Sequence, residues 1–196
     1  QNSGIDEALI RKADMGFPGY DRIKCGDYIK GNYHGHGIEL CDLNLSELRT
    51  VRHGKTTSTR YVTVFQGPYM RISYDKELSS PVTLTKRYQL LSGNPVKLES
   101  EEFNRKYKVY CDSEHDAFYI LTPHMMERIE SVHEKAADDI YINFCNDGHV
   151  YIAIDNKRDS FEVGFMDKSI EEIEKRFDRE LSYLLSVTDE LMEGLE

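Results

Sequence analysis

Residues 140–154 consist of two alternating runs of apolar side chains, separated by a short turn sequence. Successive side chains of a strand point to opposite faces, so such alternation is typical of a strand that buries one face. The turn contains Asp147-Gly148, a pair favoured in tight hairpins. The segment therefore predicts an antiparallel β-hairpin, whose alternating apolar residues are Ile140, Ile142, Phe144, Val150, Ile152 and Ile154.

Strand signals also dominate the first half of the chain. Residues 27–48 contain apolar positions punctuated by glycines, and residues 60–74 indicate a strand pair or one bent strand, interrupted at Gly67-Pro68. Residues 82–84 alternate again. Residues 52–59 (RHGKTTST) are polar and turn-like, and we interpret them as a loop.

N-cap signals mark the helices of the middle of the chain. Ser100 is followed by two glutamates, which the positive end of a helix dipole favours in the first turn. Ser113 with Asp116 resembles a capping box, and Thr122 precedes a proline, which is well placed at the first position of a helix. Another short helix is expected within residues 4–14.

The C-terminal segment has the most regular helical pattern. Ser169 and Glu172 form a capping box, and the apolar residues that follow are spaced by three, four or sums of these. We expect an amphipathic helix over residues 169–193. Leu185 and Val187 widen its apolar stripe beyond a coiled-coil seam, which favours packing on the rest of the domain over a two-stranded coiled coil. The coiled coil stays open as an alternative.

Strand-rich and helix-rich segments are mixed without a regular βαβ alternation. This favours an α+β fold, mainly antiparallel β-sheet with several short helices and a long C-terminal amphipathic helix. The 196 residues suit a single α+β domain over residues 1–196. A hydrophobic content of 39% is too high for a disordered chain.

Composition also limits the function. A formal net charge of −10 argues against general nucleic-acid binding, which needs basic surface. No apolar run is long enough to span a bilayer, and no signal peptide is recognisable. The start at Gln1 leaves room for an anchor or targeting segment upstream.

The four cysteines are isolated in the sequence. They form no C-x-x-C pair, which excludes a zinc ribbon and a thioredoxin-type motif. We expect buried free thiols in a reducing compartment, rather than one or two disulfides in an exported domain, for the residues Cys25, Cys41, Cys111 and Cys145.

His34 and His36 are the only candidates for a metal site. On a strand both imidazoles would face the same side, and Cys25, Glu39 or Cys41 could complete the ligand set. Two ligands without a third at a known spacing are a weak signal, so we favour a polar, glycine-rich turn.

Other chemical motifs are weaker still. The run GKTT at residues 54–57 resembles the end of a P-loop, but position 49 is Arg where that motif needs glycine. The spacings of Cys111 to His115 and of Cys145 to His149 would allow a nucleophile and its base, yet such pairs arise easily by chance. We therefore predict no catalytic residue and no cofactor, and we favour a non-enzyme.

One segment reverses the acidic charge of the chain. Between Leu48 and Tyr74 there is no acidic residue, whereas five basic residues occur. The segment could contact phosphates, anionic lipid headgroups or an acidic partner, or it could balance acids elsewhere in the fold. As a candidate binding surface we select Arg49, Arg52, Lys55 and Arg60.

Several further segments carry a family resemblance. Residues 96–103 (VKLESEEF) precede an aromatic strand at 107–110 (YKVY) and a helix junction at 117–123 (AFYILTP) followed by 126–129 (MERI). Together with FQG at 65–67, VYIAI at 150–154 and FE at 161–162, this order resembles a bacterial family of unknown function, domain of unknown function 3137 (DUF3137), over roughly residues 15–170. Phe118 and Pro68 depart from the family, which usually has a basic and an apolar residue there.

The resemblance implies a domain that follows one or two transmembrane helices in a small bacterial protein, with no established catalytic residue or cofactor. We expect a non-catalytic domain at the cytoplasmic face of a membrane, which binds an unknown protein partner or an anionic membrane surface, and neither nucleic acid nor a specific small molecule. The alternative is a metal-dependent hydrolase that uses His34 and His36. A third hypothesis is oligomerisation through the C-terminal helix.

Overall fold

A computed structural model of the chain describes residues 4–53, 56–86, 91, 95–136, 138–158 and 169–195. Seven strands form one antiparallel sheet with the order β1-β2-β3-β7-β6-β4-β5. The strands are β1 (Arg22–Tyr33), β2 (His36–His53), β3 (Thr56–Ser73), β4 (Val82–Thr85), β5 (Lys108–Tyr110), β6 (Asp139–Cys145) and β7 (His149–Asp155). The helices are α1 (Glu7–Lys12), α2 (Glu101–Lys106), α3 (Glu114–Ile120), α4 (Pro123–Ala136) and α5 (Ile170–Leu195). The predicted α+β class, the β6–β7 hairpin and the long C-terminal helix are confirmed.

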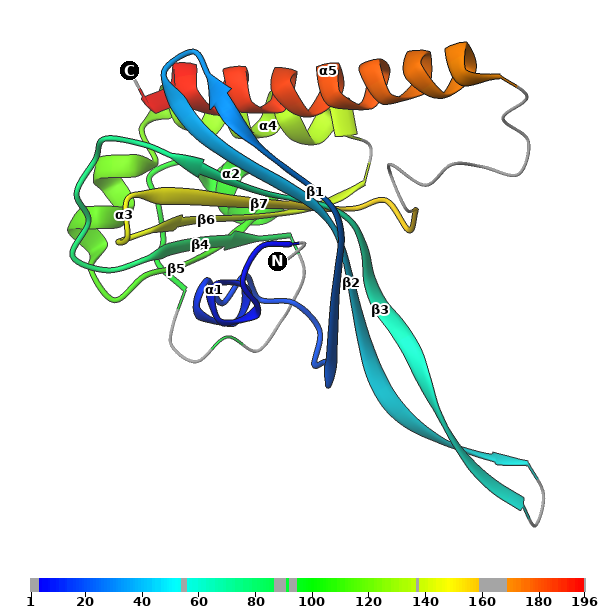
Figure 1. Cartoon of the computed structure of the whole chain (residues 1–196). Coiled ribbons are helices and arrows are strands. Elements are labelled where there is room, and N and C mark those ends of the chain that lie inside the picture. Colours follow the sequence, from blue (N-terminus) through cyan, green and yellow to red (C-terminus); the bar gives the residue numbers. More distant parts are fainter. Residues whose placement is uncertain are drawn as a thin grey trace.

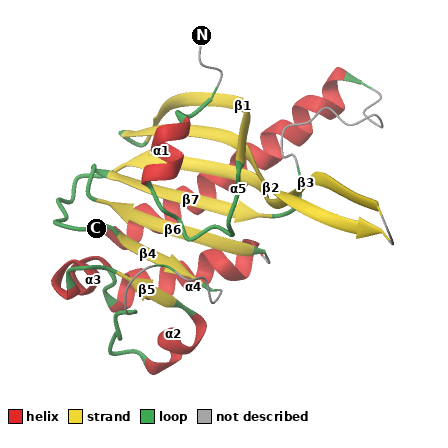
Figure 2. Cartoon of the chain, turned by 90° about the horizontal axis from the view of Figure 1, so that it is seen from below, coloured by secondary structure: helices red, strands yellow, loops and turns green. Residues whose placement is uncertain are grey.

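The helices lie on both faces of the sheet. α4 and α5 cover one face, and α1 lies against the other (Figure 1). α2 and α3 lie near the β4–β5 edge, as the view from below shows (Figure 2). A hydrophobic cluster occupies each face, which is why the central strands are buried on both sides.

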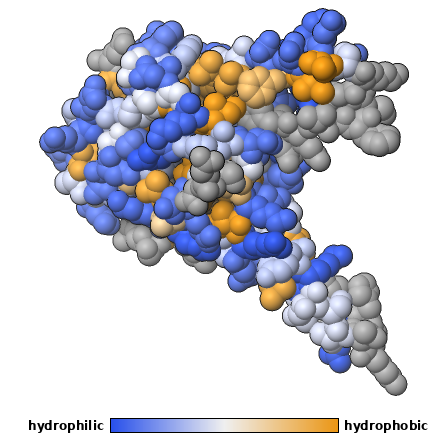
Figure 3. All heavy atoms as spheres, viewed as in Figure 1, coloured by the Kyte–Doolittle hydropathy of each residue, from blue (hydrophilic) through white to orange (hydrophobic). Residues whose placement is uncertain are grey.

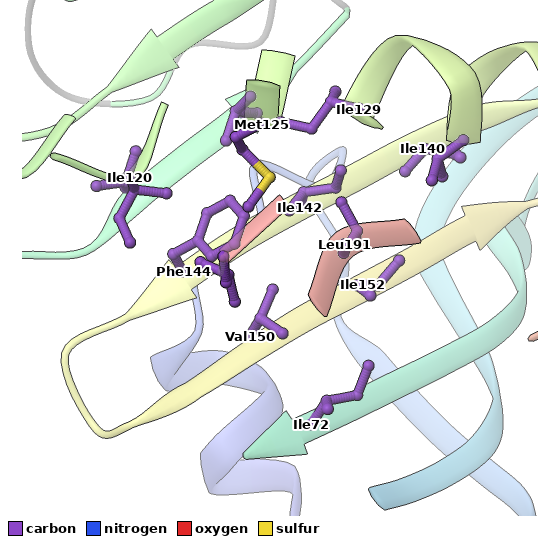
Figure 4. Packing of buried hydrophobic residues seen from close by; sticks show 14 of the residues in the cluster. Ile72, Ile120, Met125, Ile129, Ile140, Ile142, Phe144, Val150, Ile152 and Leu191 are labelled. Carbon is purple, nitrogen blue, oxygen red and sulfur yellow. The ribbon is translucent and has the colours of Figure 1, made fainter. Parts of the chain in front are cut away.

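The register arranges side chains in rows across the strands. One row on the face of α4 and α5 is wholly apolar, because each residue lies opposite the next in the pairing: Leu40, Met70, Ile152, Ile142, Leu84 and Val109. Figure 4 shows Ile142 of β6 and Ile152 of β7 beside Leu191 of α5 and Met125 of α4. This shared cluster fixes the two helices on the sheet.

α5 is held by its C-terminal half. Leu184, Val187 and Leu191 are buried against the sheet, and Arg128 of α4 forms an ion pair of 3.1 Å with Glu190. The packing role predicted for this helix is confirmed for that half. The apolar stripe continues toward the N-terminus of α5, where Ile170 is 75% exposed. In the part of the chain that the structure describes, none of the helices combines the length and apolarity that crossing a bilayer requires.

The predicted N-caps are confirmed by hydrogen bonds. The side-chain oxygens of Ser100, Ser113, Thr122 and Ser169 each accept a bond of 3.2 Å from a backbone N–H three residues later. The capping box at Ser113 is only half formed. The carboxylate of Asp116 instead accepts hydrogen bonds from the backbone N–H groups and hydroxyls of Ser79 and Ser80, so it ties α3 to the loop before β4.

Two predictions for the first half of the chain are wrong. Residues 52, 53 and 56–59 are not a loop but the paired ends of β2 and β3, and Arg52 lies opposite Thr57. Of the two alternatives for residues 60–74, the single strand is confirmed, but the interruption expected at Gly67-Pro68 is wrong, because β3 runs through it. Gly67 has a φ of +151°, a backbone conformation that only glycine adopts readily, and this allows the strand to pass Pro68 without ending.

The expectation of four free thiols is wrong for two of them. Cys25 on β1 and Cys41 on β2 form a disulfide, with their Cα atoms 6.1 Å apart. The hairpin between the two strands brings these residues together, although they are 16 positions apart in the sequence. Cys111 and Cys145 are free.

Candidate functional site

The hairpin formed by β2 and β3 extends well beyond the rest of the sheet. The last pair between β1 and β2 is Arg22 with Ser46, and β7 pairs with β3 only at residues 69–73. Residues 47–53 and 56–62, which we call the arm, therefore form a two-stranded ribbon. The arm projects from the body of the molecule as a narrow and largely hydrophilic extension (Figures 1 and 3).

The base of the arm is tied to the start of β1. The backbone N–H of Leu48 donates a hydrogen bond of 2.7 Å to the carboxylate of Asp21. The guanidinium of Arg22 lies 5.4 Å from the centre of the Tyr61 ring, a cation–π distance. These contacts fix the orientation of the arm relative to the sheet.

The pairing of the arm separates the predicted basic residues onto two faces. Arg49 lies directly opposite Arg60, so both side chains are on one face. Arg52 lies opposite Thr57, three positions further along β2, and is therefore on the other face. Lys55 is outside the described residues. The structure thus brings together two of the four predicted residues and places a third on the reverse of the same ribbon.

The arginines of the arm are exposed and can form ion pairs with a partner. Arg49 forms an ion pair of 2.6 Å with Glu47, but both side chains are well exposed. Within the described ranges, Arg52 and Arg60 form no ion pair, and both are exposed. Like charges directly opposite each other destabilise a β-ribbon, and Glu47, which lies on the same face as Arg49 and Arg60, offsets part of this repulsion.

The arm also exposes apolar surface that sequence reasoning did not select. Leu48 and Tyr61 are a directly opposed pair and are 49% and 52% exposed. They share a face with Arg52. The alternation of small polar and basic residues around them gave no sign of this pair, because it becomes visible only when the two strands are set in register.

His34 and His36 do not converge. His34 and Gly35, with φ values of +48° and +91°, form the two-residue turn between β1 and β2, which matches the turn that we favoured for this segment. His34 Nδ1 lies 3.5 Å from the carboxylate of Asp189 on α5, whereas His36 Nδ1 lies 2.9 Å from the carbonyl oxygen of Ser73. Among the described residues, no three His, Cys, Asp or Glu side chains are grouped to hold a metal ion.

A second polar cluster lies on the α1 face of the sheet, around Arg71. The guanidinium donates hydrogen bonds to Glu39 at 3.1 Å and to the Tyr151 hydroxyl at 3.2 Å, and lies 3.1 Å from His149 Nδ1. Lys30 forms an ion pair with Glu39 at 3.3 Å. Lys30, Glu39, Arg71 and Tyr151 are successive members of one row across four strands, so register alone assembles them.

The carboxylates of this cluster are held in their charged form. Burial opposes ionisation of Glu39, but hydrogen bonds from Tyr28 and Lys30 and the charge of Arg71 outweigh it, so the pKa of Glu39 lies below its usual value. The pKa of Asp147 is lowered in the same way: burial opposes ionisation, but the hydrogen bond from Tyr151 and the charges of His149 and Arg71 together outweigh it.

The arrangement around Arg71 fits a structural role. A cavity of about 270 Å³ adjoins it, lined in part by Lys30, Glu39 and His149. Each guanidinium nitrogen of Arg71 has a partner within the protein, so three of its five N–H donors are already engaged. We interpret the cluster as an ion-pair network that links β1, β2, β3 and β7 on this face of the sheet.

The two cysteine–histidine pairs do not form a nucleophile and base. Cys145 and His149 are opposite each other in the β6–β7 hairpin, but burial raises the pKa of the Cys145 thiol, which disfavours the reactive thiolate. The Cys111 thiol donates a hydrogen bond to the carbonyl of Ser113, and His115 lies beside Asp116 instead.

Fold and surface together define a class: a two-faced antiparallel α+β domain with a projecting basic β-ribbon. Residues 63–192 match the family described as Protein of unknown function (DUF3137), and the chain belongs to that family. No curated protein and no solved structure shows significant similarity to the chain. The matched region begins at Thr63, where the arm ends, so the family match does not extend to the arm. The organisation of residues 1–196 as one domain stays a prediction.

Proposed function

We propose that this domain is a non-catalytic binding module and that the arm carries the contact with its partner, a protein or an anionic membrane surface. The observation that carries this proposal is the exposed ribbon that presents arginines on both faces, in a chain whose net charge is −10. Projecting, charged surface that contributes nothing to the core is typical of binding sites.

The metal-dependent hydrolase has no support from the geometry. His34 contacts α5 and His36 contacts β3, and neither shares a third ligand with the other. The ion-pair network around Arg71 has the residue types of an active site, but its members satisfy one another.

The compartment stays a prediction. The family resemblance favours a membrane-anchored protein, and the expected free thiols favoured its cytoplasmic face. The disulfide of Cys25 and Cys41 is more typical of oxidising compartments. Alkylation of free thiols in intact cells, followed by mass spectrometry, distinguishes the two compartments. An alkylated Cys25 supports the cytoplasmic face, and a Cys25 that resists alkylation because it is in the disulfide contradicts it.

The function is tested by capture from lysate of the native organism, membranes included. The arm variant, Arg49→Glu, Arg52→Glu and Arg60→Glu, is compared with a body variant that has the same change of charge, Lys12→Glu, Lys97→Glu and Arg105→Glu, at exposed positions away from the arm. We expect the arm variant to lose the captured partner and the body variant to retain it. Identical capture by the wild type and both variants would rule out the arm as the contact.

A further inference from the structure

We infer that the arm binds the headgroup layer of an anionic lipid membrane, an inference that rests on the proposed binding function of the arm. The alternatives are an acidic protein surface and no anionic partner at all. Three features of the arm favour lipid headgroups: its length, the distribution of its charges around the ribbon, and its exposed pair of Leu48 and Tyr61.

The length of the arm separates its charges from the acidic body. Seven residue pairs extend beyond Ser46, and at about 3.4 Å per residue they reach about 24 Å. Arg49 and Arg60 lie three pairs beyond Ser46, about 10 Å along the ribbon, and Arg52 lies six pairs beyond it, about 20 Å. The Debye length at physiological ionic strength is about 8 Å, so Arg52 above all is screened from the charges of the body. The body carries the net acidity of the chain, and contact through the end of the arm keeps it beyond the range at which an anionic surface repels it.

The charges surround the ribbon. Arg49 and Arg60 lie on one face, and Arg52 lies on the other. A protein surface that docked on the arm would meet one face and leave the opposite arginine in water. Mobile headgroups can surround a ribbon that enters their layer end-on, so arginines on both faces would find phosphates.

The apolar pair suits the same environment. Tyr61 has an aromatic body and a polar hydroxyl, and such side chains are enriched at membrane–water interfaces. Leu48 lies beside it, and both are about half exposed. Arg22 and Arg52 share their face, one toward the sheet and one toward the end of the arm. Leu48 and Tyr61 lie four residues closer to the body than Arg52, so in an end-on approach they meet the outer, water-facing side of the headgroup layer.

The inference is tested by sedimentation with vesicles of equal parts phosphatidylglycerol and phosphatidylethanolamine, and with vesicles of phosphatidylcholine. We expect the wild-type protein to bind the anionic vesicles only. Each arginine near an anionic surface contributes about 1 kcal/mol, a factor of about five, so loss of three in the arm variant should weaken binding by at least about 100-fold. The body variant should bind like the wild type. Circular dichroism confirms that both variants fold.

Each other result overturns the inference. Equal loss in both variants would mean that binding follows net charge and not the arm. Equal binding to phosphatidylcholine would mean that headgroup charge is not recognised. If no vesicle is bound but capture from lysate still depends on the arm, the partner is a protein: the lipid inference fails and the proposed function stands. If capture is also independent of the arm, both fail.

Discussion

His133 makes the stability of the domain depend on pH in a way that one substitution should remove. Its imidazole is buried on α4, 6% exposed, with its ring centre 4.8 Å from that of Tyr107. Burial, together with the positive charge of Lys86, lowers the pKa of His133 to about 3. In the unfolded chain an imidazole titrates near its usual pKa of about 6.5. The folded state therefore holds a neutral ring where the unfolded state binds a proton.

The sign and size of the effect follow from this difference. The unfolded state binds more protons below about pH 6.5, so stability is complete above that value and falls as the pH drops toward about 3. The slope approaches about 1.4 kcal/mol per pH unit, which gives a loss of about 2.5 kcal/mol between about pH 7 and about pH 4.5. That is a large fraction of the roughly 5–15 kcal/mol by which a domain is stable.

The assay is urea unfolding followed by circular dichroism at both pH values and constant ionic strength. His133→Leu cannot titrate, so we expect its free energy of unfolding to change by about 2.5 kcal/mol less than that of the wild type. The compared quantity is the difference in the free energy of unfolding between the two pH values. A change in packing that lowers stability equally at both pH values cancels in this difference. The control is His124→Gln, an exposed residue of α4, which should behave like the wild type. An equal loss in His133→Leu and the wild type would refute the reasoning.

Three other substitutions test the fold. Gly67→Ala should destabilise by more than about 2 kcal/mol, because its φ is +151° and an added Cβ would collide with the carbonyl of Ile154; thermal unfolding measures the loss. Asp116→Asn should lose about 1.5–3 kcal/mol in urea unfolding. Ser79 lowers the pKa of Asp116 to about 2, so this contribution is present above about pH 3.8 and is lost as the pH falls through about 2. Arg71→Met should lose about 2 kcal/mol by urea unfolding, because the Glu39 carboxylate and the Tyr151 hydroxyl lose their donor.

Each of these substitutions has a matched control at an exposed position. Gly19→Ala adds a Cβ with no atom within 4 Å. Asp112→Asn changes the same group as Asp116→Asn, and Lys24→Met removes one positive charge as Arg71→Met does, both at exposed positions. The three controls should stay within about 0.5 kcal/mol of the wild type. A control that loses as much stability as its counterpart would contradict the structural explanation of that site.

The elements that sequence predicted well are those whose signals are local. Asp147-Gly148 marks its hairpin, and each serine or threonine cap accepts a bond from an N–H only three residues away. The family resemblance, stated on residues 96–129 above all, lies inside the region that the family match covers. These features need no knowledge of the tertiary register.

The strands of the arm were not predicted from the sequence, because alternation of apolar and polar residues marks a strand with one buried face and is absent from a strand exposed on both faces. Thr57, Ser58 and Thr59 expose their side chains on both faces of a free ribbon, so no apolar period of two appears there. Threonine is β-branched and suits a strand, but its polarity and the neighbouring glycine indicated a loop. Arg49, Arg52 and Arg60 are exposed, and their division between two faces depends on a pairing that the sequence does not show.

Long-range pairings were likewise out of reach. The disulfide depends on the β1–β2 register, and a spacing of 16 residues has no motif. The partners Glu39 and Arg71 are 32 residues apart, and Arg71 and His149 are 78 apart. A single sequence gives the residue types of such a network but not which strands lie side by side.

The account depends most on the arm being the part of the molecule that touches the partner, and a tryptophan reporter measures this directly. The chain contains no tryptophan, so Tyr61→Trp places the only one on the arm, and Phe118→Trp places it on α3, where Phe118 is 43% exposed. Emission is recorded as anionic vesicles, or a partner captured from lysate, are added. We predict a blue shift for the arm reporter and none for the α3 reporter. A shift at α3 with none at the arm would contradict the account.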